Sequence, residues 1–170
     1  AHRDPNMQFI APMASPELRY LFEQQCAQVA PRQLIRLEQG RAREVLAACD
    51  VAIVASGTAT LETALSKRPM VVAYRMGRMT ATLLRRFALV KVPFFSQPNL
   101  LAGRELVPEY FQERVTGEIL GRAAWQWFES PQRVAEVEAA FDDIHQRLRR
   151  GGAALAAQHI AALIDASPAA

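Results

Sequence analysis

The short stretch Ser56-Gly57-Thr58, followed by Glu62, carries the clearest chemistry in this sequence. It comes directly after the apolar run Val51 to Ala55, and the spacing of Thr58 and Glu62 places both side chains on one face of a helix. A helix N-terminus favours an anion such as phosphate, and a glycine lets the ligand approach the backbone closely. A carboxylate accepts two hydrogen bonds, which suits the adjacent hydroxyls of a ribose. The pattern therefore indicates a nucleotide, with its phosphate at the turn and its sugar at Glu62.

A second interpretation of the same residues needs no ligand. A serine or threonine with a glutamate a few residues later is also a common way to cap a helix, because both groups satisfy free backbone N–H groups. The sequence contains neither GxGxxG nor GxxxxGK[ST], so the standard dinucleotide and Walker fingerprints do not favour the nucleotide. From the residues alone, capping and ligand binding both stay open.

The composition limits the remaining choices. A chain of 170 residues with 51% hydrophobic and 22% charged residues has the profile of one globular domain, and a net charge of +3 is too common to identify a partner. Two cysteines without a CxxC pair and three histidines without ligand spacing predict no disulfide framework, no metal site and no bound cofactor. The aromatic residues are not interleaved with basic ones, so we expect no nucleic-acid partner.

Apolar runs alternate with helix-forming segments through the first half of the chain. We predict strands at Gln8–Ala11, Gln33–Leu37, Val51–Ala55 and Met70–Tyr74, and helices at Glu17–Val29, Arg41–Ala48 and Thr58–Lys67. Val51–Ala55 is wholly apolar, which predicts a strand covered on both faces. Strands and helices that alternate at this spacing indicate the α/β class, with a parallel sheet flanked by helices.

The second half of the chain is mostly helical by pattern. We predict a helix at Met79–Val90, a short strand at Val92–Phe95, a loop at Gln97–Gly103, and helices at Ile119–Phe128, Pro131–Arg149 and Gly152–Ile164. The last three form a helical tail over residues 116–165 of a single domain that spans residues 1–170. Trp125, Trp127 and Phe128 are expected as core or interface anchors.

Two blocks of sequence carry a resemblance to a known family. ASGTATLETALSKRPMVVAYRM, followed by QPNLLAGRELVPEYFQE, resembles the carboxyl-terminal half of the bacterial lipid-A-disaccharide synthases, which are GT-B glycosyltransferases. The resemblance covers about residues 8 to 165. It implies a Rossmann-like domain that binds the donor UDP-2,3-diacylglucosamine. The sugar would be transferred to 2,3-diacylglucosamine 1-phosphate with release of UDP and without a metal, in the cytoplasm at the face of the inner membrane.

The resemblance also implies contacts with the UDP-sugar for particular residues. Ser56, Gly57 and Thr58 would approach the diphosphate, and Glu62 would accept the ribose hydroxyls. The further residues implied are Asn99 and Arg104 as polar contacts, Glu105 orienting Arg104, and Tyr74 and Arg75 at the rim of the next strand. An asparagine in a loop also often only closes a turn, and an Arg-Glu pair often only forms a surface salt bridge.

The synthases of this family are considerably longer than this chain. We therefore expect a fragment that is incomplete at its N-terminus and lacks the lipid acceptor site, the catalytic carboxylates and the Gly-Ser-Arg loop that opens the nucleotide domain, so that it is inactive alone. Two rival interpretations remain, a GT-B relative that uses another nucleotide sugar and a non-catalytic interaction domain.

Two further expectations concern surfaces. The segment MTATLLRRFALV could form a basic amphipathic helix that contacts an anionic membrane, although such a helix more often packs on the core. An unpaired apolar face on the late helices could promote a homodimer.

Overall fold

The computed structural model of this protein describes residues 6–29, 35–77, 93–149 and 151–166. The helix expected at residues 79–90, with its membrane contact, lies outside the described residues. The described elements are β1 (Phe9–Met13), α1 (Pro16–Val29), β2 (Ile35–Gln39), α2 (Ala42–Ala48), β3 (Ala52–Ala55), α3 (Thr58–Leu65), β4 (Met70–Tyr74), α5 (Gln97–Ala102), β5 (Glu109–Phe111), a 3-10 turn (Gln112–Arg114), α6 (Gly117–Phe128), α7 (Pro131–Leu148) and α8 (Gly152–Ala166).

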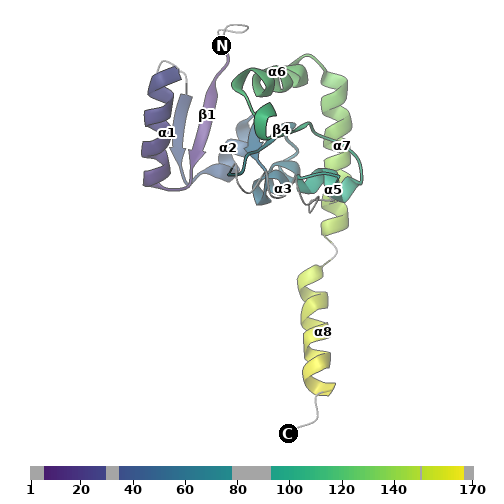
Figure 1. Cartoon of the computed structure of the whole chain (residues 1–170). Coiled ribbons are helices and arrows are strands. Elements are labelled where there is room, and N and C mark those ends of the chain that lie inside the picture. Colours follow the sequence, from purple (N-terminus) through teal and green to yellow (C-terminus); the bar gives the residue numbers. More distant parts are fainter. Residues whose placement is uncertain (1–5, 30–34, 78–92, 150, 167–170) are drawn as a thin grey trace.

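All strand pairs in the described structure are parallel. β1 pairs with β2 in a two-stranded sheet, and β3, β4 and β5 form a second sheet with β4 in the centre. Helices flank both sheets (Figure 1). The α/β class predicted from the alternation of strands and helices is therefore confirmed, and so are the four strands and three helices predicted in the first half, within a few residues at their ends.

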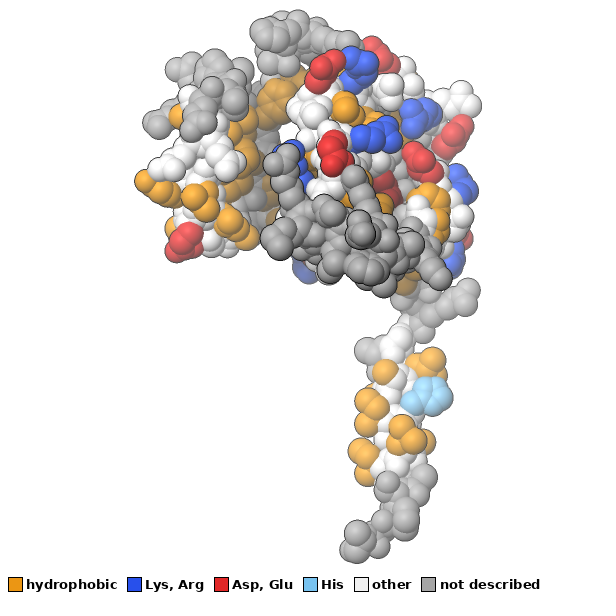
Figure 2. Space-filling view, viewed as in Figure 1, with side chains coloured by type: hydrophobic (Ala, Val, Ile, Leu, Met, Phe, Trp, Pro, Cys, Tyr) orange, Lys and Arg blue, Asp and Glu red, His pale blue; other side chains and the backbone are white. Residues whose placement is uncertain are grey.

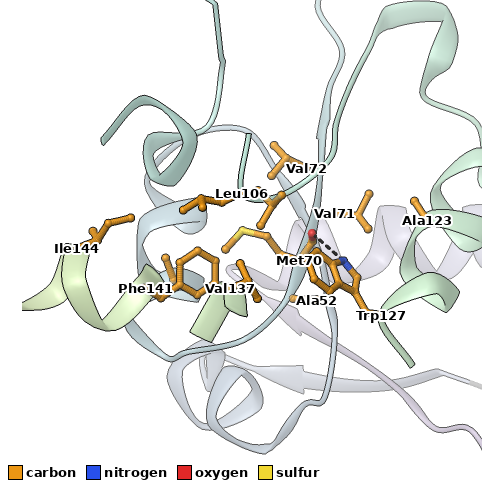
Figure 3. Packing of buried hydrophobic residues seen from close by; sticks show 12 residues of the cluster. Ala52, Met70, Val71, Val72, Leu106, Ala123, Trp127, Val137, Phe141 and Ile144 are labelled. Atoms are coloured by element: carbon orange, nitrogen blue, oxygen red, sulfur yellow. Dashed lines mark hydrogen bonds between the residues drawn. The ribbon is translucent and has the colours of Figure 1, made fainter. Parts of the chain in front are cut away.

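The hydrophobic core is built around β4. Met70, Val71 and Val72 are at most 1% exposed, because β3 and β5 flank this strand and helices cover it. The indole N–H of Trp127 on α6 donates to the carbonyl of Met70 at 3.2 Å, and Phe141 on α7 is fully buried in the same cluster (Figure 3). Trp127 is thus the core anchor expected from the sequence.

One prediction about burial is wrong. β3 is not covered on both faces, because Ile53 is 53% exposed while its register partner on β4, Val71, is 0% exposed. An apolar run indicates a strand that can be buried, but the position of the strand in the sheet decides whether it is. β4 is central and buried, whereas β3 is an edge strand in the described structure.

The region between β4 and α6 differs from its predicted pattern. Gln97–Gly103 is not a loop: Gln97–Ala102 is a helix with proline in its first turn, and Gly103 ends it with φ of 67°. Proline is compatible with the first turn of a helix and a left-handed glycine often ends one, so Pro98 and Gly103 bound a helix here, and the loop predicted from them is wrong. No strand forms at residues 93–95, and β5 was not predicted.

The three late helices behave differently from one another. α6 packs on the second sheet, and α7 packs against α3, α5 and α6 and buries Val137, Phe141 and Ile144. α8 stands away from the rest of the molecule (Figure 1), and Figure 2 shows hydrophobic side chains along it. Leu155, Leu163 and Ile164 are 54–70% exposed. In the described part of the chain, no helix is both long enough and apolar enough to cross a membrane.

Candidate functional site

The turn between β3 and α3 lies at the carboxyl end of the second parallel sheet. Gly57 is the N-cap of α3, with φ of 136° and ψ of −159°. Residues other than glycine rarely adopt this backbone conformation. Among the described residues, a Cβ placed on Gly57 would meet no heavy atom within 4 Å, so none of them fills the space beside this glycine. Open space at the end of a parallel strand, before a helix N-terminus, is where α/β sheets bind ligands.

Among the described residues, no side chain caps α3. The Ser56 hydroxyl donates instead to the carbonyl of Phe95 at 3.0 Å, and the Thr60 hydroxyl donates to the carbonyl of Gly57 at 2.7 Å. In the first turn of α3 the N–H of Thr60 donates to the Gly57 carbonyl at 3.1 Å, and no described residue accepts from the N–H groups of Thr58 and Ala59. The capping interpretation is therefore not what the structure shows, and two helix donors remain open for a ligand.

Glu62 lies one helical turn beyond Thr58, and both residues are exposed. Within the described residues, the Glu62 carboxylate has no hydrogen bond and no ion pair; only its backbone carbonyl accepts from the Ser66 hydroxyl, at 2.9 Å. The carboxylate can therefore accept hydrogen bonds from a ligand that lies at the N-terminus of α3.

A second wall of the site is the segment from Phe95 to Gln97. Its position is fixed by Glu109 at the start of β5, whose carboxylate accepts from the backbone N–H of Phe95 at 2.6 Å, from that of Ser96 at 2.9 Å and from the Ser96 hydroxyl at 2.6 Å. The N–H of Gln97 then donates to the Thr60 hydroxyl at 3.3 Å, which ties this segment to α3. The sequence offers one signal for Glu109, a carboxylate inside a short apolar run.

Asn99 lies in the interior, with an exposed fraction of 0%. Its carbonyl oxygen accepts from the N–H groups of Leu106 and Val107 at 2.7 and 3.0 Å, and its amide nitrogen donates to the Val107 carbonyl at 2.8 Å and to Glu109 at 2.7 Å. These four bonds use the two donors and both acceptor positions of the side chain. Asn99 therefore holds the chain after α5 in place and supports the site through Glu109.

Tyr74 and Arg75 follow at the carboxyl end of β4. The Tyr74 ring stacks on Phe95 and Phe111 with centroid distances of 6.0 and 5.8 Å, so it joins the end of the sheet to the wall described above. Arg75 is exposed beside it. Gln112 fixes the next residue, because its side chain exchanges two hydrogen bonds of 3.2 Å with the backbone of Met76. The end of β4 therefore carries one half-buried ring and one exposed guanidinium.

Arg104 and Glu105 lie elsewhere. They are exposed and follow Gly103, at the opposite end of α5 from the contact between Gln97 and Thr60. Six helical residues separate the two ends by about 9 Å. No ion pair joins Arg104 to Glu105 in the described structure. The structure thus brings together the turn, Glu62, Tyr74 and Arg75, and places Arg104 and Glu105 apart from them.

The described residues contain no group of three or more His, Cys, Asp or Glu side chains that could hold a metal ion. The turn instead has the groups of an anion-binding site that uses no metal or charged donor. These groups are backbone N–H groups at a helix N-terminus, a glycine without a side chain, hydroxyl groups, and one carboxylate a turn away. These groups can bind a phosphate and orient a polyol, and none of them is placed as a nucleophile with a base beside it.

Comparison with known proteins identifies the family. The family model described as lipid-A-disaccharide synthetase matches residues 2–163. The chain belongs to this family. The lipid-A-disaccharide synthase of Alkalilimnicola ehrlichii is 46% identical over 160 residues, which are 94% of this chain and 41% of the relative. That of Azotobacter vinelandii is 46% identical over 164 residues, 96% of this chain and 42% of the relative. That of Alcanivorax borkumensis is 40% identical over 165 residues, 97% and 42% respectively.

Membership in the lipid-A-disaccharide synthetase family bears out the resemblance on which the sequence-based roles rest. The chain spans less than half the length of these relatives, since the matched regions are 41–42% of their sequences. Most of each relative therefore has no counterpart in the 170 residues described by the sequence.

Proposed function

We propose that this chain is the nucleotide-sugar-binding part of a lipid-A-disaccharide synthase. The observation that carries the proposal is the N-terminus of α3: it opens at the carboxyl end of a parallel strand, no side chain caps it, and Glu62 one turn away has no partner in the described structure. The ligand that fits these groups is UDP, with its diphosphate at Gly57 and Thr58 and its ribose hydroxyls at Glu62.

Each group has a defined task in this proposal. The N–H groups of Thr58 and Ala59 and the helix dipole stabilise the diphosphate, both in the bound donor and as the leaving group, where the negative charge increases during transfer. The Ser56 hydroxyl positions the wall segment through Phe95 and does not need to touch the ligand. Arg75 lies where it can reach a phosphate or the uracil, and the Tyr74 ring limits the space available to the base.

The donor in this proposal is UDP-2,3-diacylglucosamine and the acceptor is 2,3-diacylglucosamine 1-phosphate. The chain contributes the donor site, and the acceptor site and the catalytic base belong to the part of the family that this chain does not span. We propose that the chain alone binds UDP and does not transfer sugar. The acylated substrates place the enzyme at the cytoplasmic face of the inner membrane, in peripheral contact with anionic lipid.

The experiment that tests the donor site is a calorimetric titration of UDP into the wild-type chain, Glu62→Gln and Glu138→Gln. The Gln side chain keeps one carbonyl acceptor and loses the charge, so we expect Glu62→Gln to weaken UDP binding by about 1.5–3 kcal/mol, or about 10- to 150-fold. Glu138 on α7 carries the same charge change away from the turn and should leave the affinity unchanged.

The stability of the two variants separates ligand binding from a structural role. Glu62 is exposed and has no partner in the described residues, so its replacement should change the free energy of unfolding by less than about 0.5 kcal/mol. If Glu62→Gln instead destabilised the fold and left UDP affinity intact, the carboxylate would be a structural element of α3 and the assignment to ribose would fail.

One observation favours a second candidate, a non-catalytic interaction domain. α8 exposes Leu155, Ile160 and Leu163 by 54–70%, which is typical of a helix that packs against another chain or domain. Analytical ultracentrifugation discriminates the two. A homodimer that forms through α8 in a chain that does not bind UDP would favour the interaction domain, whereas UDP binding by the chain, whatever its oligomeric state, favours the donor site.

A further inference from the structure

Gln112 combines a strained backbone with burial at the carboxyl edge of the second sheet. It follows Phe111, the last residue of β5, its φ of 51° is left-handed, and it is 7% exposed. Residues other than glycine adopt this conformation at a cost in free energy, and such residues cluster at functional sites. A glycine would adopt it without that cost, so what Gln112 adds at this position is its side-chain amide.

The amide of Gln112 bonds to the chain that follows β4. Its Oε1 accepts from the N–H of Met76 at 3.2 Å, and its Nε2 donates to the carbonyl of Met76 at 3.2 Å. A primary amide presents the same kinds of donor and acceptor as a backbone peptide group, so it can take the place of a neighbouring strand. Two bonds to one residue fix both the position and the orientation of Met76.

The register of the sheet shows what this amide replaces. Tyr74 lies opposite Phe111, and β5 ends there because the chain turns into a 3-10 helix. The N–H of Val72 donates to the carbonyl of Pro108 at 2.9 Å, and backbone groups alternate in direction along a strand. Met76, four residues further on, therefore also directs its N–H and C=O toward the side of β5. The amide continues the ladder there, one step beyond the end of β5.

Arg75 lies between Tyr74, the last residue of β4, and Met76. By the same alternation its own N–H and C=O point toward β3, where no described residue bonds to them. The two bonds from Gln112 are therefore the only hydrogen bonds between described residues that hold the chain from Arg75 to Gly77. Without them, nothing among these bonds would keep this segment in line with the strand.

The segment lies beside the turn of the candidate site. The N–H of Ser56 donates to the carbonyl of Ala73 at 3.0 Å, so the chain leaves β3 for Gly57 next to the residues that follow Ala73. Arg75 is exposed, and no described residue forms a hydrogen bond or ion pair with its guanidinium. A long free side chain loses rotamer freedom when it binds, so its contribution to affinity depends on a backbone that is already in place.

We infer that Gln112 is a positioning residue for the donor site: its amide holds Met76 so that the guanidinium of Arg75 reaches an anion bound at the N-terminus of α3. The inference rests on the proposed function, because the anion is the diphosphate of UDP. Gln112 does not contact the ligand itself, since it is buried and bonds to Met76 through both polar atoms of its side chain. Arg75 supplies the positive charge that the N–H groups of the turn lack.

The first measurement needs no ligand and compares amide hydrogen exchange in the wild-type chain and in Gln112→Gly. Glycine keeps the left-handed backbone and removes only the amide, so the N–H of Met76 should exchange at least about 10-fold faster in the variant. The N–H of Val72, which bonds to Pro108, is the internal control and should change much less. Unchanged exchange at Met76 would overturn the inference, because the amide would then not hold this segment.

The second measurement is a titration of UDP into the isotope-labelled wild-type chain, Gln112→Gly and Gln112→Ala, followed by nuclear magnetic resonance. In the wild type, UDP should shift the side-chain Nε–H resonance of Arg75 together with the backbone resonances of Thr58 and Ala59. In both variants the shifts of Thr58 and Ala59 should persist. The shift of the Arg75 resonance should fall at least about 3-fold, and the affinity for UDP about 5-fold.

The two variants separate positioning from stability. Alanine keeps the backbone strain that glycine relieves, so Gln112→Ala should unfold at a lower urea concentration than Gln112→Gly, while both lose the same UDP affinity. Affinity that instead follows the unfolding midpoint would show a structural role alone and overturn the inference.

The wild-type titration separates the inference from the proposed function. An Arg75 shift that is undiminished in both variants, or absent from a wild type that still shifts Thr58 and Ala59, would overturn the inference and leave the proposed function intact. No shift of Thr58 and Ala59 in the wild type would contradict the proposed function, and the inference with it.

Discussion

Asn99→Ala should destabilise the protein strongly, because this side chain is a structural connector. The substitution leaves the N–H groups of Leu106 and Val107 and the carbonyl of Val107 without their partners, and Leu106 and Val107 are at most 9% exposed. A buried polar group without a partner costs about 1–3 kcal/mol, and partial relaxation lowers the sum for three neighbours, so we expect a loss of about 3–5 kcal/mol. This is a large part of the 5–15 kcal/mol that stabilises a typical domain.

Urea unfolding followed by circular dichroism measures the loss. With a slope of about 2 kcal/mol/M, the midpoint of unfolding should fall by about 1.5–2.5 M. The control is Gln126→Ala, which removes the same amide group from an exposed position on α6 and should shift the midpoint by less than about 0.3 M. A midpoint for Asn99→Ala within about 0.5 M of wild type, together with lost UDP binding, would refute the structural role and restore Asn99 as a direct ligand contact.

Two further predictions concern the packing of α7 and the thiol of Cys49, the C-cap of α2. Lys67→Met should lower the free energy of unfolding by about 1–2 kcal/mol, because the Lys67 ammonium donates to the Phe141 carbonyl at 2.9 Å and pairs with Asp142 at 3.0 Å. The control Arg122→Met breaks only an exposed pair with Glu118 and should cost less than about 0.5 kcal/mol. Equal losses for the two variants in urea unfolding would contradict this prediction. Burial raises the pKa of the Cys49 thiol, and the nearby charge of Arg68 opposes this with a smaller effect. Labelling of Cys49 by iodoacetamide, followed by mass spectrometry, should therefore reach half its maximal rate at a higher pH in the folded chain than in urea. In urea the midpoint of labelling is about pH 8.5. Because the fold favours the neutral thiol, its contribution to stability is complete below the pKa of the unfolded chain and is lost as the pH rises through the pKa of the folded chain. A labelling midpoint in the folded chain at or below that of the unfolded chain would show that burial does not control this thiol.

The elements of the fold that depend on local sequence could be predicted. The helix predicted at Glu17–Val29 forms as α1, where the N–H of Leu18 donates to the Ser15 hydroxyl at 3.3 Å, and the apolar run at residues 70–74 forms the central strand β4. Burial could not be predicted in the same way. β3 and β4 have equally apolar sequences, and only the pairing of strands, which is a long-range property, makes one central and leaves Ile53 exposed.

The candidate site was predicted as far as it is local. The turn, the helix that follows it and the exposed carboxylate of Glu62 are contiguous in sequence, so their relation follows from helix geometry. The role of Glu109 could not be predicted, because its partners Phe95 and Ser96 lie on a separate segment. Asn99 and Arg104 share one loop motif, yet α5 turns the first into the core and leaves the second on the surface.

The measurement that tests the central claim most directly is a titration of UDP into the isotope-labelled chain, followed by nuclear magnetic resonance. The account predicts that UDP at concentrations up to about 1 mM, equivalent to a binding free energy near −4 kcal/mol, shifts the backbone resonances of Thr58, Ala59 and Glu62 before any others. Resonances of α8 and of Arg104 should not move. Binding that shifts only residues away from the N-terminus of α3, or no shift at that concentration, would contradict the assignment of this turn as the nucleotide site.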